Sequence, residues 1–97
     1  MLYVTLMTRK AGTTLGRKES RARRVTWKYP EGMKVLGEYW VPSDDPSVVM
    51  IAEAESLAPV YRAMEDWDDV FEFRVFPAIT AEAGIAMARQ AMEAAVA

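Results

Sequence analysis

The chain of 97 residues contains no cysteine and no histidine. Without cysteine there is no disulfide, no thiolate nucleophile and no thiolate ligand for zinc or an iron–sulfur cluster. Without histidine there is no Ser–His–Asp triad and no histidine-bound haem or iron. Proton transfer would have to use Asp, Glu, Lys or Tyr, and a metal would depend on carboxylates alone. We therefore expect no metal site and no cofactor.

The sequence also lacks long apolar runs. No stretch of about 18 apolar residues is present, so we expect no membrane span. The first ten residues, MLYVTLMTRK, lack the charged start and long apolar core of a signal peptide, which predicts a cytoplasmic location. The length predicts a single domain over residues 1–97.

Charge is unevenly distributed along the chain. Residues 1–30 hold eight basic and one acidic side chain, a net +7, whereas residues 31–97 hold four basic and thirteen acidic ones, a net −9. The sum is the formal net charge of −2. Such an asymmetry predicts that the two parts face each other or a charged partner.

Apolar alternation and β-branched residues predict strands over residues 2–8, 34–41, 47–54 and 70–79. Helical spacing predicts helices from Thr13 or Thr14 to about Trp27, after Ser56 to about Trp67, and over residues 81–96 after Thr80. This β-α-β-β-α-β order predicts an α+β, ferredoxin-like plait over residues 1–80, with a C-terminal helix over residues 81–96. The antiparallel sheet should have the strand order 4-1-3-2.

Both main helices should cover one face of this sheet. The uniformly apolar set Leu2, Val4, Leu6, Phe71, Phe73 and Val75 suits the helix layer. The uncovered face should then carry Tyr3, Thr5, Met7, Leu36, Glu38, Trp40, Val49, Ile51, Glu53, Glu72, Arg74 and Phe76. Because that face is too apolar to leave in water, we expect it to pack against a second copy as a homodimer.

The basic residues of the first helix form a stripe at i, i+4, i+7 and i+11: Arg17, Arg21, Arg24 and Lys28. The acids at 65–69 end the second helix, where the helix dipole disfavours them. In the plait these acids should face Arg9, Lys10, Arg17 and Lys18. The alternative for the stripe is a nucleic-acid surface, which we consider unlikely because no base-reading motif accompanies it; the narrow apolar face of this helix argues against membrane binding.

Several segments resemble a family of small, uncharacterised single-domain proteins of bacteria and archaea. They are MLYVTLMT, PEGMKVLGEYWVP, VVMIAEAES, the EDW at the end of the second helix, and FEFRVFPAI. The resemblance covers roughly residues 1–80 and implies membership of the dimeric α+β-barrel, ferredoxin-like superfamily. It implies no assigned activity. Relatives that share the barrel include cofactor-free monooxygenases, lactone isomerases and haem-degrading enzymes, but fold analogy is a weak guide to function.

The candidate ligand-binding residues lie on the face predicted to be uncovered: Tyr3, Thr5, Glu38, Trp40, Glu53 and Arg74. A carboxylate such as Glu53 on an apolar strand should have a raised pKa unless paired, and so could act as a general base. Arg74 could bind a ligand carboxylate, and Trp40 could form a flat apolar wall. Alternatively, Glu53 pairs with Arg74 or Tyr3 and only fixes the register.

Two functions remain open from the sequence. The first is a homodimeric barrel that binds a small organic ligand, with enzymatic activity undecided. The alternative is a structural or protein-interaction module without a ligand.

Overall fold

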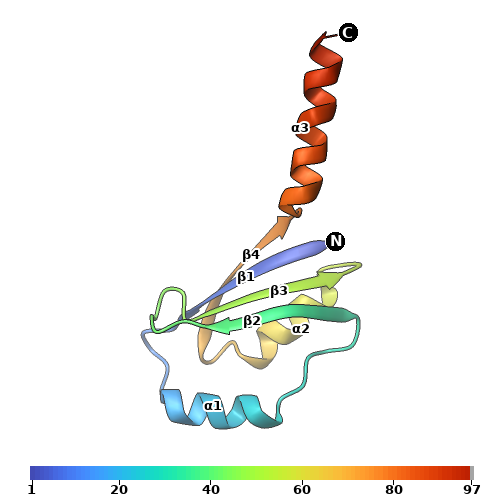
Figure 1. The fold of residues 1–97 in the computed structure, drawn as a ribbon. Coiled ribbons are helices and arrows are strands. Elements are labelled where there is room, and N and C mark those ends of the chain that lie inside the picture. Colours follow the sequence, from blue (N-terminus) through green and yellow to red (C-terminus); the bar gives the residue numbers. More distant parts are fainter. Residues whose placement is uncertain (97) are drawn as a thin grey trace.

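The structure is a computed structural model that describes residues 1–96. Its elements in chain order are β1 (Leu2–Arg9), α1 (Arg17–Thr26), β2 (Met33–Trp40), β3 (Val48–Ala54), α2 (Ala58–Asp66), β4 (Phe71–Ala78) and α3 (Ala81–Val96). Figure 1 shows one sheet, with α1 and α2 on one side of it and α3 projecting away from it.

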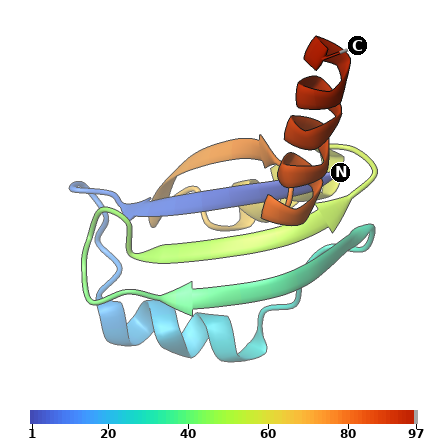
Figure 2. The same cartoon turned by 45° about the horizontal axis from the view of Figure 1, so that its top comes forward.

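The four strands form a single antiparallel sheet in the order β2-β3-β1-β4. This order is the predicted 4-1-3-2 written from the other edge. The α+β, ferredoxin-like βαββαβ plait with a C-terminal helix is therefore confirmed. Strands β1 and β3 are central, and β2 and β4 form the edges (Figure 2).

The core lies between the sheet and the two main helices. Val60 of α2 packs with Tyr3 and Ala54, and Met33, Met64 and Val75 surround them. A second cluster joins Trp67, Val70 and Phe71 with Leu15, Trp27, Met7, Val48 and Phe73. Burial of these apolar side chains supplies the main stabilising free energy of the plait.

The predicted sheet faces are right for two strands and wrong for the other two. Phe71, Phe73 and Val75 of β4 do face the helices, and Val49 and Ile51 of β3 lie on the uncovered face with their β1 partners Leu6 and Val4. In β1, however, Tyr3 and Thr5 are buried under the helices, whereas Val4 lies opposite. Both sides of β1 are apolar, so its alternation did not reveal which side is covered.

In β2 the prediction is wrong because of a β-bulge. Pairing with β3 shifts by one residue between Val35, which pairs with Ala52, and Gly37, which pairs with Ile51. The extra residue, Leu36, reverses the alternation that follows it. Glu38 and Trp40 consequently pair with Met50 and Val48 on the helix side rather than on the uncovered face.

Helix boundaries follow the predictions at their ends more closely than at their starts. The α1 helix begins at Arg17 after an N-cap Gly16, not at Thr13 or Thr14, and the Thr13 hydroxyl instead accepts a hydrogen bond from the Leu15 amide at 3.2 Å. The N-cap of α2 is Leu57, one residue after Ser56. The Ser56 hydroxyl accepts a hydrogen bond from the Ala58 amide at 3.3 Å.

No residue of the α3 helix is buried, and all of its residues except the half-buried Gly84 are exposed. Its predicted range and its cap are both confirmed, since the Thr80 hydroxyl accepts a hydrogen bond from the Ala83 amide at 3.0 Å. Among residues 1–96 no helix has the length and apolar character needed to cross a membrane.

Candidate functional site

A cavity of about 100 Å³ lies between the covered face of the sheet, α1 and α2, and we call it the helix-side cavity. Its floor is formed by residues of all four strands, and residues of α1, of α2 and of the segments that follow these helices complete the lining. The residues used below that line it are Thr5, Met7, Arg9, Arg17, Arg21, Arg24, Trp27, Tyr29, Glu38, Trp40, Met50, Trp67 and Phe71. Most of the lining is apolar or aromatic, with a few polar groups, as in typical small-molecule sites.

Glu38 is the centre of a hydrogen-bond network in one wall of this cavity, which we call the Glu38 network. Two nitrogens of the Arg24 guanidinium donate to its carboxylate. Nη2 lies 2.8 Å from Oε1, and Nε lies 3.2 Å from both carboxylate oxygens. The Tyr29 hydroxyl donates to Oε1 and the Trp40 indole Nε1 donates to Oε2 at 2.7 Å. Both oxygens are thus fully engaged by three side chains.

This network holds Glu38 ionised. Burial alone would raise the pKa of its carboxyl group, but the hydrogen bonds from Arg24, Tyr29 and Trp40 together lower that pKa below its ordinary value. Burial and the neighbouring carboxylate raise the pKa of Tyr29, so its hydroxyl stays protonated as a donor. Glu38 is therefore a fixed anion that orients its neighbours and is a poor general base.

Aromatic rings extend the network along the wall. The Arg24 guanidinium lies 5.0 Å from the centre of the Tyr29 ring and 5.4 Å from that of Trp27. Trp27 packs edge-on against Tyr29 and against Trp67, at 4.8 and 5.8 Å between centroids. Edge-on ring contacts and a cation over the ring faces fix these side chains more rigidly than apolar contact alone.

Thr5 lies on the floor of the cavity, on central strand β1, and is 1% exposed. Its hydroxyl oxygen has no hydrogen-bond partner among residues 1–96. A buried hydroxyl without a partner costs about 1–3 kcal/mol. Such a group, placed in the wall of a cavity, is a ready hydrogen-bond partner for a bound molecule.

The charges around the cavity are mostly positive. Four arginines line it, Arg9, Arg17, Arg21 and Arg24, against one carboxylate, that of Glu38. Arg24 is neutralised by Glu38, and Arg17 pairs with Asp44 outside the lining. In the described part of the chain, Arg9 and Arg21 have no carboxylate partner. The cavity therefore favours an anionic ligand group beside these two arginines.

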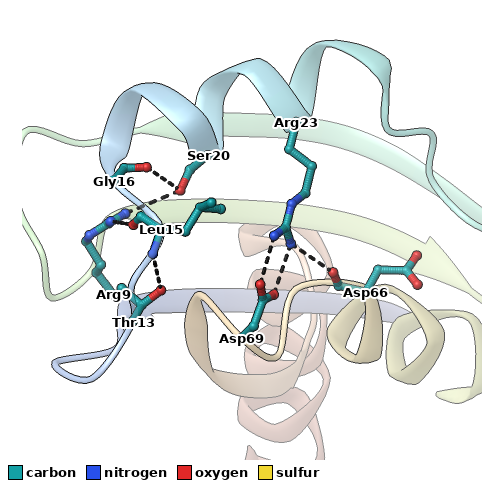
Figure 3. Close-up of polar contacts among 8 residues, drawn as sticks. All are labelled: Arg9, Thr13, Leu15, Gly16, Ser20, Arg23, Asp66 and Asp69. Carbon is teal, nitrogen blue, oxygen red and sulfur yellow. Dashed lines mark hydrogen bonds and ion pairs between the residues drawn. The ribbon is translucent and has the colours of Figure 1, made fainter.

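Polar contacts at both ends tie α1 to neighbouring segments of the chain (Figure 3). The Arg23 guanidinium bonds both carboxylate oxygens of Asp69, at 2.9 and 2.8 Å, and reaches the backbone carbonyl of Asp66 at 3.4 Å. The indole of Trp27 donates to the Asp66 carboxylate at 2.9 Å. These bonds anchor the C-terminal end of α1 and the following Trp27 to the last residue of α2 and the segment after it.

The other end of α1 is anchored by Arg9. Its guanidinium donates to the backbone carbonyl of Leu15 and lies 3.5 Å from the Ser20 hydroxyl, which itself donates to the Gly16 carbonyl at 2.9 Å (Figure 3).

The acidic end of α2 is balanced by two basic side chains. Arg23 pairs with Asp69, and Lys10 lies 3.6 Å from Asp68. Of the four basic residues expected to face these acids, Arg9, Lys10, Arg17 and Lys18, Lys10 is the one that forms an ion pair with them within residues 1–96, whereas Arg17 pairs with Asp44.

The structure brings together only part of the predicted site. Thr5, Glu38 and Trp40 line the helix-side cavity. Tyr3 lies on the same face but is packed in the core against Val60.

Glu53 and Arg74 lie on the opposite face of the sheet, so the structure does not bring the six predicted residues together in one pocket. Glu53 lines a shallow depression with Lys34 and Gly32. Arg74 donates to Asp45 at 2.8 Å rather than pairing with Glu53. The bulge in β2 and the reversed face of β1 account for this division. No cluster of three or more acidic side chains suited to a metal occurs in residues 1–96.

Sequence reasoning missed Tyr29 and the pairing of Arg24 with Glu38. The sequence analysis placed Arg24 in the basic stripe of the first helix and assigned no role to Tyr29. One available signal was Gly37, since a glycine inside a strand often marks a bulge. A bulge placed there would have moved Glu38 under the helices.

These features define a ferredoxin-like α+β protein with an electropositive cavity, lined mostly by apolar and aromatic side chains, between its sheet and its helices. The chain belongs to the family described as "Domain of unknown function (DUF3303)", whose model matches residues 1–92. Searches of curated proteins and of solved structures found no match to the chain.

Proposed function

We propose that this protein binds a small organic carboxylate in the helix-side cavity, with its apolar body inside and its acidic group beside Arg9 and Arg21. The observation that carries the proposal is the buried, unpartnered hydroxyl of Thr5 in the cavity floor. Burying a polar group without a partner is costly, and a ligand would remove that cost.

The size and chemistry of the cavity limit the ligand. In another protein, a cavity of roughly 150 Å³ holds one benzene molecule. The cavity here, at about 100 Å³, is smaller, so it suits a short branched chain or at most one small ring, with the acidic group outside the enclosed space. Trp27, Trp40 and Phe71 offer flat apolar contacts to such a body, while Arg9 and Arg21 supply uncompensated positive charge.

The proposed roles differ among the lining residues. Thr5 forms a hydrogen bond with the ligand, Trp40 packs against it, and Arg21 attracts its carboxylate. Glu38 acts indirectly, because both of its oxygens are occupied by Arg24, Tyr29 and Trp40. This arrangement supports binding and orientation; Glu53 and Arg74 take no part in the site.

A thermal-shift titration with benzoate tests the proposal, with benzyl alcohol as the neutral analogue. We expect benzoate to raise the melting temperature more than benzyl alcohol does. With Thr5→Val or Arg21→Gln, about ten times more benzoate should be needed to give the same rise in melting temperature. Thr8→Val is the matched control, because Thr8 lies at the end of β1 and donates to Asp45.

A chain that no small aromatic or aliphatic carboxylate stabilises at millimolar concentration would contradict the proposal. So would a stabilisation that Thr5→Val and Arg21→Gln leave unchanged. In either case the alternative, an interaction module without a ligand, would be favoured.

The other sequence-based expectations remain predictions. These are the homodimer formed through the open sheet face, membership of the dimeric α+β-barrel superfamily, and a cytoplasmic location. A nucleic-acid surface has less support, because Arg17 and Arg24 of the basic stripe are already paired with Asp44 and Glu38. If an oligonucleotide does not bind at low salt, that surface is excluded.

A further inference from the structure

We infer that α3 is an exchanged arm: in a two-fold dimer, the α3 helix of each copy packs on the uncovered sheet face of the other. Two surfaces of the same chain carry this inference. One is the apolar side of α3 and the other is the apolar centre of the sheet. Both lie away from the helix-side cavity, so the inference is independent of ligand binding.

The α3 helix has the composition of a buried helix. Its only polar side chains, Glu82, Arg89, Gln90 and Glu93, fall within a sector of roughly 100° at 100° per residue. The rest of its circumference is Ala, Gly, Ile, Met and Val. Yet Ile85, Met87 and Met92 are 52%, 60% and 69% exposed. A helix that is apolar over most of its surface is normally covered by a partner.

An isolated helix of this length is also marginal in water. Sixteen residues are close to the lower limit for a stable free helix, even with many alanines. In proteins most helix stability comes from packing of an apolar face. Within residues 1–96, α3 makes no buried contact with the plait. Its stability therefore calls for another surface.

The uncovered sheet face offers that surface. Its central row runs across three adjacent strands through Ile51, Val4 and Phe76, which are cross-strand neighbours. Leu2, Leu6, Val49 and Tyr39 flank this row, and the charged Glu53, Glu72 and Arg74 lie toward its edges. An apolar centre with a polar rim is the usual anatomy of a protein interface.

The dimensions of the two surfaces match. Sixteen residues at 1.5 Å each give α3 a length of about 24 Å. Strands of seven to eight residues at about 3.3 Å each span roughly 23–26 Å. Two helix-on-sheet contacts related by a two-fold axis would bring the interface into the range of roughly 1,200–2,000 Å² that stable dimers bury.

The junction between β4 and α3 directs the helix outward rather than back onto its own sheet. Figures 1 and 2 both show α3 leaving the end of β4 and pointing away from the strands. The Thr80 carbonyl and hydroxyl accept hydrogen bonds from Gly84 and Ala83, both at 3.0 Å. The Ile79 side chain lies against Gly84. This capped turn favours a partner in a second copy.

Engineered cysteines test the exchange directly, because the native chain has none. One chain carries Met92→Cys on the apolar side of α3, and a second carries Ile51→Cys at the centre of the sheet face. Mixed and oxidised, they should form a covalent heterodimer. Glu93→Cys, on the polar side of α3, is the matched control and should form at least about tenfold less crosslinked product with Ile51→Cys.

Each other outcome overturns the inference. An intramolecular disulfide in a monomeric chain with both Met92→Cys and Ile51→Cys would show that α3 folds back onto its own sheet. A Met92→Cys homodimer without any crosslink to Ile51→Cys would show that two α3 helices pair with each other. A native chain that is monomeric by light scattering at micromolar concentration would exclude a dimer of any kind.

A pair of charge variants provides a second measurement. Met92→Glu should raise the dimer dissociation constant at least about a hundredfold, because it buries an unpaired carboxylate at both symmetric contacts. Gln90→Glu places the same charge in the polar sector and should leave the dissociation constant within about threefold. Both plaits should stay folded by circular dichroism, since α3 is exposed in the single chain. Equal dissociation constants for the two variants would contradict the inference.

Discussion

The guanidinium of Arg24 lies across both carboxylate oxygens of Glu38, with Nη2 2.8 Å from Oε1 and Nε 3.2 Å from each oxygen. The pair joins α1 to edge strand β2, two elements that are otherwise separated by the helix-side cavity. It is also partly shielded from solvent, with the side chains of Arg24 and Glu38 only 30% and 16% exposed. Removing one partner of such a shielded pair is costly, because the other charge is then left partly buried without compensation.

Glu38→Gln should therefore destabilise the fold. It removes the charge that compensates Arg24 and weakens the bonds from Tyr29 and Trp40. We expect the free energy of unfolding to fall by about 1–3 kcal/mol, as measured by urea denaturation. Glu72→Gln, on the exposed face of β4, is the control and should stay within about 0.5 kcal/mol of the native chain.

The contribution of Glu38 should depend on pH. Hydrogen bonds to its ionised form place its pKa in the folded state below the usual 4.5. Its stabilising effect is therefore complete above about pH 4.5 and is lost as the pH falls through the lower, folded-state value. The difference in unfolding free energy between the native chain and Glu38→Gln should be constant from pH 7 to pH 5 and shrink below that. A difference that grows on acidification would contradict the assignment.

Thr5→Val should stabilise the ligand-free protein. It replaces a buried hydroxyl that has no partner with a methyl group of similar size. We expect the free energy of unfolding to rise by about 0.5–2 kcal/mol. Thr8→Val should have the opposite sign, because it removes a hydrogen bond of 2.7 Å to Asp45. If both variants were destabilised equally, the Thr5 hydroxyl would have a partner in solution.

Arg23→Gln should loosen α1 in particular. The bidentate bond from Arg23 to Asp69 is one of the main ties between α1 and the rest of the plait (Figure 3). We expect amide hydrogen exchange over residues 17–26 to speed up several-fold, with little change in β1 or β3. Mass spectrometry of peptide fragments measures this. Arg89→Gln on α3 is the control. If it speeds up exchange over residues 17–26 as much as Arg23→Gln does, the Arg23 bond does not hold α1.

Much of the fold could be predicted from the sequence because it depends on local signals. The order of elements, the strand order and the α3 range follow from apolar spacing, caps and prolines. The face of each strand was harder. β1 is apolar on both sides, so its period does not show whether Tyr3 or Val4 is covered. In such a strand only tertiary packing decides the face.

For the same reason, only half of the candidate site could be predicted from the sequence. Thr5, Glu38 and Trp40 were placed on one face together and do line one cavity. The bulge at Leu36, however, moved Glu38 and Trp40 to the helix side and left Glu53 and Arg74 behind. Arg24 and Tyr29 reach Glu38 from 14 and 9 residues away. A pairing at such distances depends on how α1 crosses the sheet, which periodicity does not encode.

A methyl-NMR titration of the native chain with benzoate tests the central claim most directly. If the ligand enters the helix-side cavity, the methyl signals of Thr5, Met7 and Met50 should shift and saturate together. Those of Val4 and Ile51 on the other sheet face should not move, and Thr5→Val should raise the dissociation constant about tenfold. Shifts confined to Val4 and Ile51, or no saturable shift at all, would contradict a ligand site between the sheet and the helices.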